Sequence, residues 1–200
     1  MKRLAKGMVI GLVLSFIIGA GVWALSVGLD FKTGPSDSAV SRFCDYLYTS
    51  SVGMGIRESI WVFPILEGTH LLGIALSVGV LCWFDLRLLG LVLTDEPVEK
   101  VWKSVMPVAL VGFVLMFGTG LFLFWAEART AFHSVHFWIK IALLVIVGIN
   151  ALVFELTSHS KMHDWQDAAA VPMNARMAGV ISLVLWAAII ITGRTMAYTF

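Results

Sequence analysis

Five long apolar stretches divide the chain, and short polar segments separate them. Each stretch approaches or exceeds the roughly 20 residues that a helix needs to cross the hydrocarbon core of a bilayer. The pattern therefore predicts an all-α protein, an integral membrane helical bundle of five transmembrane helices. The predicted spans are Met8–Leu29, Ile60–Leu81 with a helical continuation to about Leu91, Met106–Trp125, Val135–Glu155 and Met177–Tyr198.

The segment between the first two stretches has an amphipathic pattern. Pro35-Ser36-Asp37 is a helix-start signal, and apolar residues then recur at helical spacing at Val40, Phe43, Cys44 and Leu47. This one-sided apolar face predicts a short periplasmic helix on the outer membrane surface, ending at 50–55. The helix either covers a site near His70 or only buries its apolar face.

These elements form a single transmembrane domain over 1–200. Its parts are an uncleaved N-terminal anchor helix at 1–30, the periplasmic surface helix and loop at 36–58, and a four-helix bundle at 59–200. The polar loops at 94–105 and 157–175 are too short to be soluble catalytic domains, so we expect any chemistry to take place inside the bundle.

The composition supports a membrane location. Hydrophobic residues make up 59% of the chain and charged residues only 14%, whereas soluble chains carry about a quarter charged residues. The formal net charge of +1 does not indicate a nucleic-acid partner, and two cysteines are too few for a disulfide framework. The bilayer itself is the first predicted partner.

Lys and Arg counts predict the orientation. With the N-terminus inside, the cytoplasmic segments hold Lys2, Arg3, Lys6, Arg87, Lys100, Lys103, Lys161 and Arg176, and the outer segments hold Lys32, Arg42, Arg57 and Arg129. We therefore expect a multi-pass protein of the bacterial inner (cytoplasmic) membrane with a cytoplasmic N-terminus and a periplasmic C-terminus. Asp85 and Arg87 at the inner end of the second span are expected to form an ion pair.

His70 is the most informative residue because it lies inside the second apolar stretch. An ionisable side chain within a span is costly, about 2.5–3.5 kcal/mol at the centre for Arg, Lys or Asp, and is usually functional. Glu67, His70, Gly73 and Ser77 follow at helical spacing and share a face. The alternative is simple helix packing, with Gly73 and Ser77 as the contact and His70 as an interhelical hydrogen-bonding group.

The fourth span carries a matching polar stripe of His136, Lys140 and Asn150. Lys140 either faces the bundle or extends to the outer surface, and Arg194 near the end of the fifth span suits a lipid phosphate or a cofactor carboxylate. Histidines that face each other in a helical bundle are a usual way to hold b-type haem, with cationic side chains at the propionates. We therefore predict haem b, with His70, His136, Lys140, Glu67, Arg194 and Asn150 around it.

The second axial ligand stays open between His136 and Lys140, and a five-coordinate haem is also possible. Copper is the alternative cofactor, because His133 and His136 form an H-x-x-H pair that can bind copper or zinc. His159 and His163 in the inner loop are a weaker metal signal.

At several of these positions the chain resembles a family of uncharacterised bacterial integral membrane proteins. The resemblance covers most of the chain from about Asp37 onward and is carried by Arg57-Glu58-Ser59-Ile60-Trp61, Pro64-Ile65-Leu66-Glu67-Gly68-Thr69-His70-Leu71-Leu72-Gly73, Asp85-Leu86-Arg87-Leu88-Leu89-Gly90, Phe137-Trp138-Ile139-Lys140 and Asn150-Ala151-Leu152-Val153-Phe154. A more distant similarity links it to the haem-containing protoporphyrinogen oxidase and copper-resistance D membrane families. That similarity implies His70 as a haem ligand and Lys140 as a second essential residue; His136 belongs to neither pattern.

Three functions follow as hypotheses. The leading one is a b-type haem protein that passes electrons as a subunit or partner of a redox assembly, with other membrane or periplasmic redox proteins as partners. The others are a copper-handling membrane protein and a structural accessory subunit. An electron carrier or accessory subunit is favoured over a stand-alone enzyme, because no substrate pocket is evident in the sequence.

Overall fold

A computed structural model describes residues 38–167 and 169–196. In that part of the chain every regular element is helical. The elements are α2 (Ala39–Thr49), α3 (Ser51–Arg57), α4 (Val62–Leu88), α5 (Val98–Ala126), α6 (Ala128–His133), α7 (Val135–Ser158), the 3₁₀-helix η1 (His159–Asp164) and α8 (Met173–Met196). The predicted span Met8–Leu29 and the last residues of the predicted fifth span lie outside the described residues.

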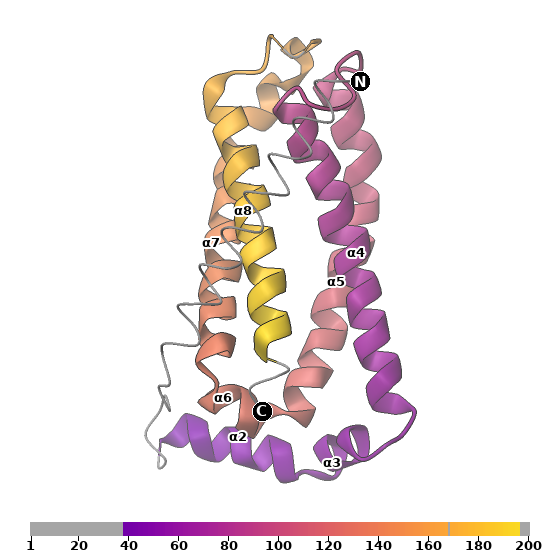
Figure 1. The fold of residues 1–200 in the computed structure, drawn as a ribbon, viewed down its shortest axis with the longest axis vertical. Helices are drawn as coiled ribbons and strands as arrows, with labels where there is room; N and C mark the ends of the chain where they lie inside the picture. The colour runs from indigo at the N-terminus through magenta and orange to yellow at the C-terminus, as the bar shows by residue number, and fades with distance from the viewer. Residues whose placement is uncertain (1–37, 168, 197–200) are drawn as a thin grey trace.

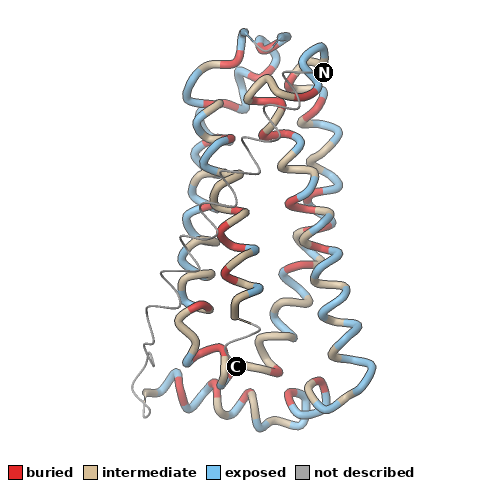
Figure 2. Tube along the Cα trace, in the orientation of Figure 1, coloured by how far each residue is buried: buried red, intermediate tan, exposed pale blue. Residues whose placement is uncertain are grey.

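Four of the described helices, α4, α5, α7 and α8, are long and apolar enough to cross a membrane, which confirms four of the predicted spans by length and composition. Figure 1 shows them side by side, running alternately up and down, with α2, α3 and α6 at one end and η1 at the other. Their outward faces carry many exposed apolar side chains, while buried positions face inward (Figure 2). This distribution suits a lipid environment.

Helix α5 begins at Val98, eight residues before the predicted start at Met106. The polar segment that suggested a loop is the first part of this helix, where Lys100 and Lys103 form i,i+4 ion pairs with Glu96 and Glu99. Val98 and Val101 face inward and pack in a core cluster with Phe84 and Phe154. The first turns of α5 therefore have a charged face and an opposite, buried apolar face, and the charged residues made the segment resemble a loop in the hydropathy pattern.

The bundle consists of two helix pairs, α4 with α5 and α7 with α8, which are joined mainly through contact between α4 and α8. The first pair packs backbone against backbone. A Cβ added to Gly73 would lie 2.7 Å from the Met116 amide nitrogen, and one added to Gly112 would lie 2.4 Å from the Ser77 amide nitrogen. Small residues allow such close approach in membrane helices, so the predicted packing role of Gly73 and Ser77 is confirmed.

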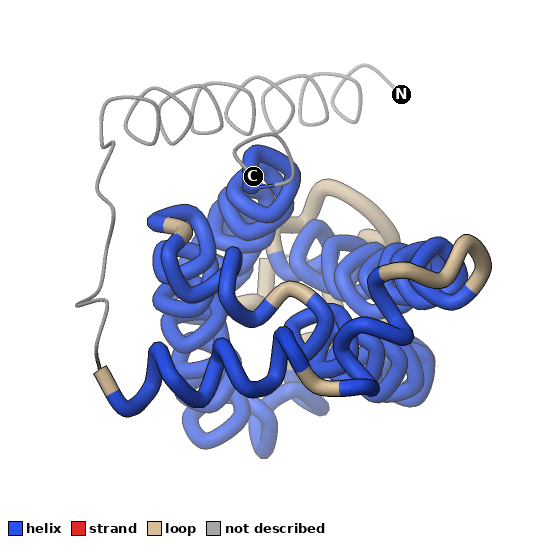
Figure 3. Tube along the Cα trace, turned by 90° about the horizontal axis from the view of Figure 1, so that it is seen from below, coloured by secondary structure: helices blue, strands red, loops and turns tan. Residues whose placement is uncertain are grey.

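The short helices α2 and α3 lie across one end of the bundle (Figure 3). Ser38 caps α2 by accepting a hydrogen bond from the Ser41 amide at 3.0 Å. The surface helix ends at Thr49 with Ser50 as its C-cap, at the start of the expected end region 50–55. That region is itself helical, because the Ser50 side chain accepts from the Gly53 amide and starts the second helix α3. Of the predicted apolar face only Cys44 and Leu47 are buried, while Val40 and Phe43 are exposed.

Two side chains connect helices α2 and α3 to the bundle by hydrogen bonds. Arg57 of α3 donates to the Ala126 carbonyl oxygen at the end of α5, at 2.8 Å, and to the Tyr48 carbonyl oxygen. The indole of Trp125 donates to Ser50 Oγ at 2.9 Å. A cation bound to the last carbonyls of a helix also interacts favourably with the helix dipole. The surface helices are therefore tied to the end of α5.

The expected ion pair between Asp85 and Arg87 does not form. Asp85 lies beside Ser182 of α8, whereas Arg87 donates through Nε to the Glu96 carbonyl oxygen at 2.8 Å. Residues two apart on a helix do not face each other, so these two side chains point to different neighbours. Arg87 instead holds the loop between α4 and α5.

The close approach of α4 and α5 gives a stability prediction. We expect Gly112→Ala to lower the unfolding free energy by about 1–3 kcal/mol, because the added methyl overlaps the Ser77 backbone and overpacking has costs of this size. Thermal unfolding in detergent measures the change. Gly118→Ala on the same helix is the matched control, since no heavy atom lies within 4 Å of its added Cβ. Equal midpoints for both variants would contradict the packing described here.

Candidate functional site

The imidazole of His70 is held in a defined orientation by α5. Its Nδ1 lies 2.8 Å from the Met116 carbonyl oxygen and 3.1 Å from Thr119 Oγ1. A carbonyl oxygen only accepts hydrogen bonds, so Nδ1 carries the proton and donates. Thr119 donates its own proton to the Leu115 carbonyl oxygen at 2.6 Å, which leaves its oxygen able to accept from His70. In the neutral ring Nε2 therefore keeps a free lone pair, and no described residue hydrogen-bonds it.

Gly120 gives the ring of His70 its space. A Cβ added at Gly120 would lie 3.1 Å from His70 Cε1, and 3.5 Å from Nδ1. Gly120 follows Gly112 and Met116 at intervals of four, so all three lie along one face of α5. That face of α5 both contacts the α4 backbone and receives the histidine.

Two charged side chains lie close enough to His70 to act on its ring electrostatically, namely Lys140 of α7 and Glu67 of α4. Glu67 is exposed on α4. Lys140 extends toward α8, where a Cβ added to Gly193 would lie 3.5 Å from Nζ. The Lys140 ammonium has no ion-pair partner in the described part of the chain. His70 and Glu67 thus lie on α4 and Lys140 on α7, which belong to different helix pairs.

His136 is a buried imidazole in the first turn of α7. It is 7% exposed, and its Nε2 has no hydrogen-bond partner. Ser134 Oγ, two residues earlier, is also buried without a partner. His70, by contrast, lies more than two turns into α4. His136 is therefore a second histidine with a nitrogen that lacks a partner. It lies at the start of α7 and takes no part in the hydrogen bonds between His70 and α5.

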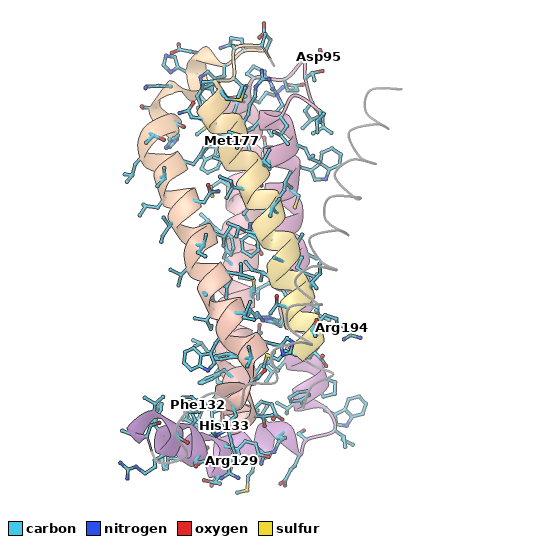
Figure 4. The ribbon with its side chains drawn as sticks, turned by 60° about the vertical axis from the view of Figure 1, so that its left-hand side comes forward. Asp95, Arg129, Phe132, His133, Met177 and Arg194 are labelled. Carbon is cyan, nitrogen blue, oxygen red and sulfur yellow. The ribbon has the colours of Figure 1, made fainter. Side chains whose placement is uncertain are left out.

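The other predicted residues lie apart from His70. Asn150 donates to the Ala178 carbonyl oxygen of α8 at 3.0 Å and links α7 to α8. Arg194 is exposed at the end of α8 (Figure 4). His133 is exposed in α6, on the side of α2, with its ring against Phe132.

The histidines of the inner loop have acidic neighbours. His159 Nδ1 contacts Glu155 Oε1, and His163 Nε2 lies 2.8 Å from Asp164 Oδ1. Within residues 38–167 and 169–196, no three His, Cys, Asp or Glu side chains are grouped so that they could hold a metal ion. The pairs His133/His136 and His159/His163 therefore gain no third protein ligand among these residues.

Sequence reasoning missed the partners of His70. The Met116 carbonyl is a backbone group and has no signature in the sequence. Thr119 and Gly120 had a weak signal, because Gly118-Thr119-Gly120 is a run of small residues inside an otherwise bulky apolar span. The second buried polar cluster, Asp85 with Ser182, was also missed because Asp85 was assigned to Arg87.

In the described residues, fold and site together define an α-helical bundle with four membrane-length helices and a histidine oriented between two of them. The chain matches a family of unknown function (DUF6644) over residues 45–199 and belongs to that family. No curated protein and no solved structure matches it. Membership agrees with the expected uncharacterised family, and the more distant similarity to haem proteins stays a prediction.

The unpaired ammonium of Lys140 gives a prediction. We expect Lys140→Met to raise the unfolding free energy by about 1 kcal/mol, because a charge inside a span costs up to about 2.5–3.5 kcal/mol at the bilayer centre. Thermal unfolding in detergent tests this. Lys161→Met on exposed η1 is the control and should have no effect. An unchanged or lower midpoint for Lys140→Met would show that the ammonium contributes to folding.

Proposed function

We propose that this protein is a membrane-embedded b-type haem protein that passes electrons, as a subunit or partner of a redox assembly. The observation that carries the proposal is the state of His70. Its Nδ1 donates a hydrogen bond to the Met116 carbonyl oxygen, and its Nε2 has no hydrogen-bond partner among the described residues. Histidines that ligate metals almost always donate their other ring nitrogen to a carbonyl, carboxylate or water, which fixes the tautomer and orients the ligand atom.

The residues around His70 fit a haem chemically. Gly120 leaves the ring unobstructed on the side of α5. The cation of Lys140 lies within electrostatic reach of the ring, and Arg194 lies at the same end of α8 as Gly193. In haem proteins cationic side chains pair with the propionates, and in a helical bundle the ligands come from facing helices. A bound haem would supply a one-electron iron couple, which is the chemistry that an electron carrier needs.

Two residues are candidates for the second axial position. His136 has a buried nitrogen without a partner, which a metal would satisfy. Lys140 is the candidate within electrostatic reach of His70, and it would ligate only in its neutral form. We propose His70 as the first axial ligand. The second ligand is identified by comparing the haem spectra of His136→Ala and Lys140→Met with that of the wild type.

The spectra of the purified protein test the proposal. We expect a Soret band, with sharp α and β bands on reduction by dithionite, in protein prepared from cells supplied with a haem precursor. His70→Ala should remove at least nine-tenths of the bound haem, because the ligand nitrogen is lost. A pyridine haemochrome assay gives the stoichiometry. A colourless, folded wild-type protein would contradict the proposal.

Glycine variants provide a matched control for the position of His70. Gly120→Val should lower haem occupancy strongly, because its side chain overlaps the imidazole, whereas Gly118→Val on the same helix has open space and should keep it. If the protein is colourless, elemental analysis separates the remaining hypotheses. Bound copper would favour copper handling, and no metal would favour a structural accessory subunit.

We also propose that the end with α2, α3 and α6 faces the periplasm of a bacterial inner membrane. In a background with Cys44→Ser and Cys82→Ser, we expect Tyr46→Cys on α2 to react with a membrane-impermeant maleimide in cells with a permeabilised outer membrane. Lys161→Cys on η1 should react only after the inner membrane is broken. Both positions are exposed, so access alone distinguishes them. The reverse result would invert the orientation.

A further inference from the structure

A second candidate site lies in the other half of the bundle, toward η1. A pocket of about 270 Å³ is enclosed by α4, α5, α7 and α8, and its wall contains none of His70, His136 or Lys140. Aromatic rings form much of the wall, and they belong to Phe84, Trp102, Phe113, Phe117, Phe154 and Trp186. Flat ring compounds pack well against such walls in offset or edge-to-face contacts.

One acidic side chain belongs to this wall. Asp85 is 6% exposed, and its Oδ2 has no hydrogen-bond partner. Ser182 of α8, which also lines the pocket, lies beside this carboxyl. A buried polar atom without a partner costs about 1–3 kcal/mol. Rotation about the Asp85 Cβ–Cγ bond is soft, so the free oxygen can turn toward a ligand in the pocket.

The pocket is accessible from the lipid side. The backbones of α5 and α7 stay apart along the middle of the bundle, and their side chains meet near its two ends, Trp102 with Phe154 toward η1 and Phe124 with Phe137 toward α6. Between them, Phe117, Gly148 and Ala151 of the pocket wall are exposed. At the end toward η1, the rings of Phe84, Trp102 and Phe154 close the pocket. A ligand would therefore enter from the bilayer rather than from water.

We infer that this pocket binds a lipid-soluble, single-ring aromatic compound with ring oxygens, of the quinol and quinone class, with Asp85 as its polar contact. The volume is at the lower limit of small-molecule sites, about 300 Å³, and suits one ring. An ionised carboxyl accepts from a quinol hydroxyl, and a protonated one donates to a quinone carbonyl. The carboxyl of Asp85 is thus suited to both forms.

The inference does not rest on the proposed haem, because the pocket and the His70 region share no residue. His70→Ala should therefore bind the ring compound as the wild type does. A colourless protein would contradict the haem proposal and leave the quinone-pocket proposal unaffected. Absence of saturable quinone binding in the wild type would contradict the quinone-pocket proposal and leave the haem proposal unaffected.

Binding of decylubiquinone to the full chain in lipid nanodiscs tests the inference. Trp102 and Trp186 line the pocket, so we expect saturable quenching of tryptophan fluorescence by this quinone. Asp85→Leu, which keeps a similar volume and removes the polar contact, should weaken binding at least tenfold, as expected for loss of a hydrogen bond to a buried carboxyl. Decylbenzene, which has no ring oxygens, should not displace the quinone.

Gly148→Leu tests the pocket independently of Asp85. No heavy atom lies within 4 Å of a Cβ at Gly148, so the larger side chain enters the pocket without a backbone clash and should abolish saturable quenching. Gly79→Leu on α4 adds the same side chain in open space outside the pocket, and should bind as the wild type does. Unsaturable quenching that is equal in all variants, or displacement by decylbenzene, would overturn the inference.

Discussion

The close contact between the backbones of α4 and α5 is the constraint on which the candidate site depends. Gly73 and Gly112 leave no space for a side chain between the two helices. This separation lets the short imidazole of His70 reach the carbonyl of Met116, the residue of α5 whose backbone also lies against Gly73. The glycines are therefore both packing residues and the reason that His70 has a fixed orientation.

The carbonyl that receives His70 is already used inside its own helix. Met116 belongs to the interior of α5, where the i→i−4 pattern of the helix gives its carbonyl oxygen the Gly120 amide as a donor in addition to the histidine. A carbonyl oxygen has two lone pairs, so it can serve a helical and an interhelical donor together. The histidine is satisfied on one nitrogen without breaking the helix. In a membrane this matters, because an unsatisfied backbone group in hydrocarbon costs several kcal/mol.

The bundle retains polar groups that lower its stability. Among the described residues, the Lys140 ammonium lacks an ion pair and His136 Nε2, Asp85 Oδ2 and both Arg87 Nη atoms lack partners. Each is unfavourable for folding in an apolar medium. Structures usually retain such groups where function requires them. Asp85 and Arg87 belong to the end of α4, and His136 and Lys140 to the first turns of α7, so these groups lie in two separate regions of the bundle.

The sequence contained most of the fold and only part of the site. Hydropathy located four spans because length and apolarity are properties of single segments. It misplaced the start of α5, since the ion pairs of Lys100 and Lys103 lie on the face opposite Val98. It also paired Asp85 with Arg87 because they are neighbours in sequence, although their separation of two residues directs them apart. The partners of His70 depend on how α4 and α5 align, which no single segment specifies.

The remaining alternative is that His70 only joins two helices. Helix joining accounts for Nδ1, which reaches Met116 and Thr119. It does not account for Nε2, a second polar atom placed in a span without a described partner, which a serine side chain would not introduce. Gly120 fits both interpretations, because the ring needs that space whether or not Nε2 binds a ligand. A ligand on Nε2 would supply the partner that helix joining leaves missing.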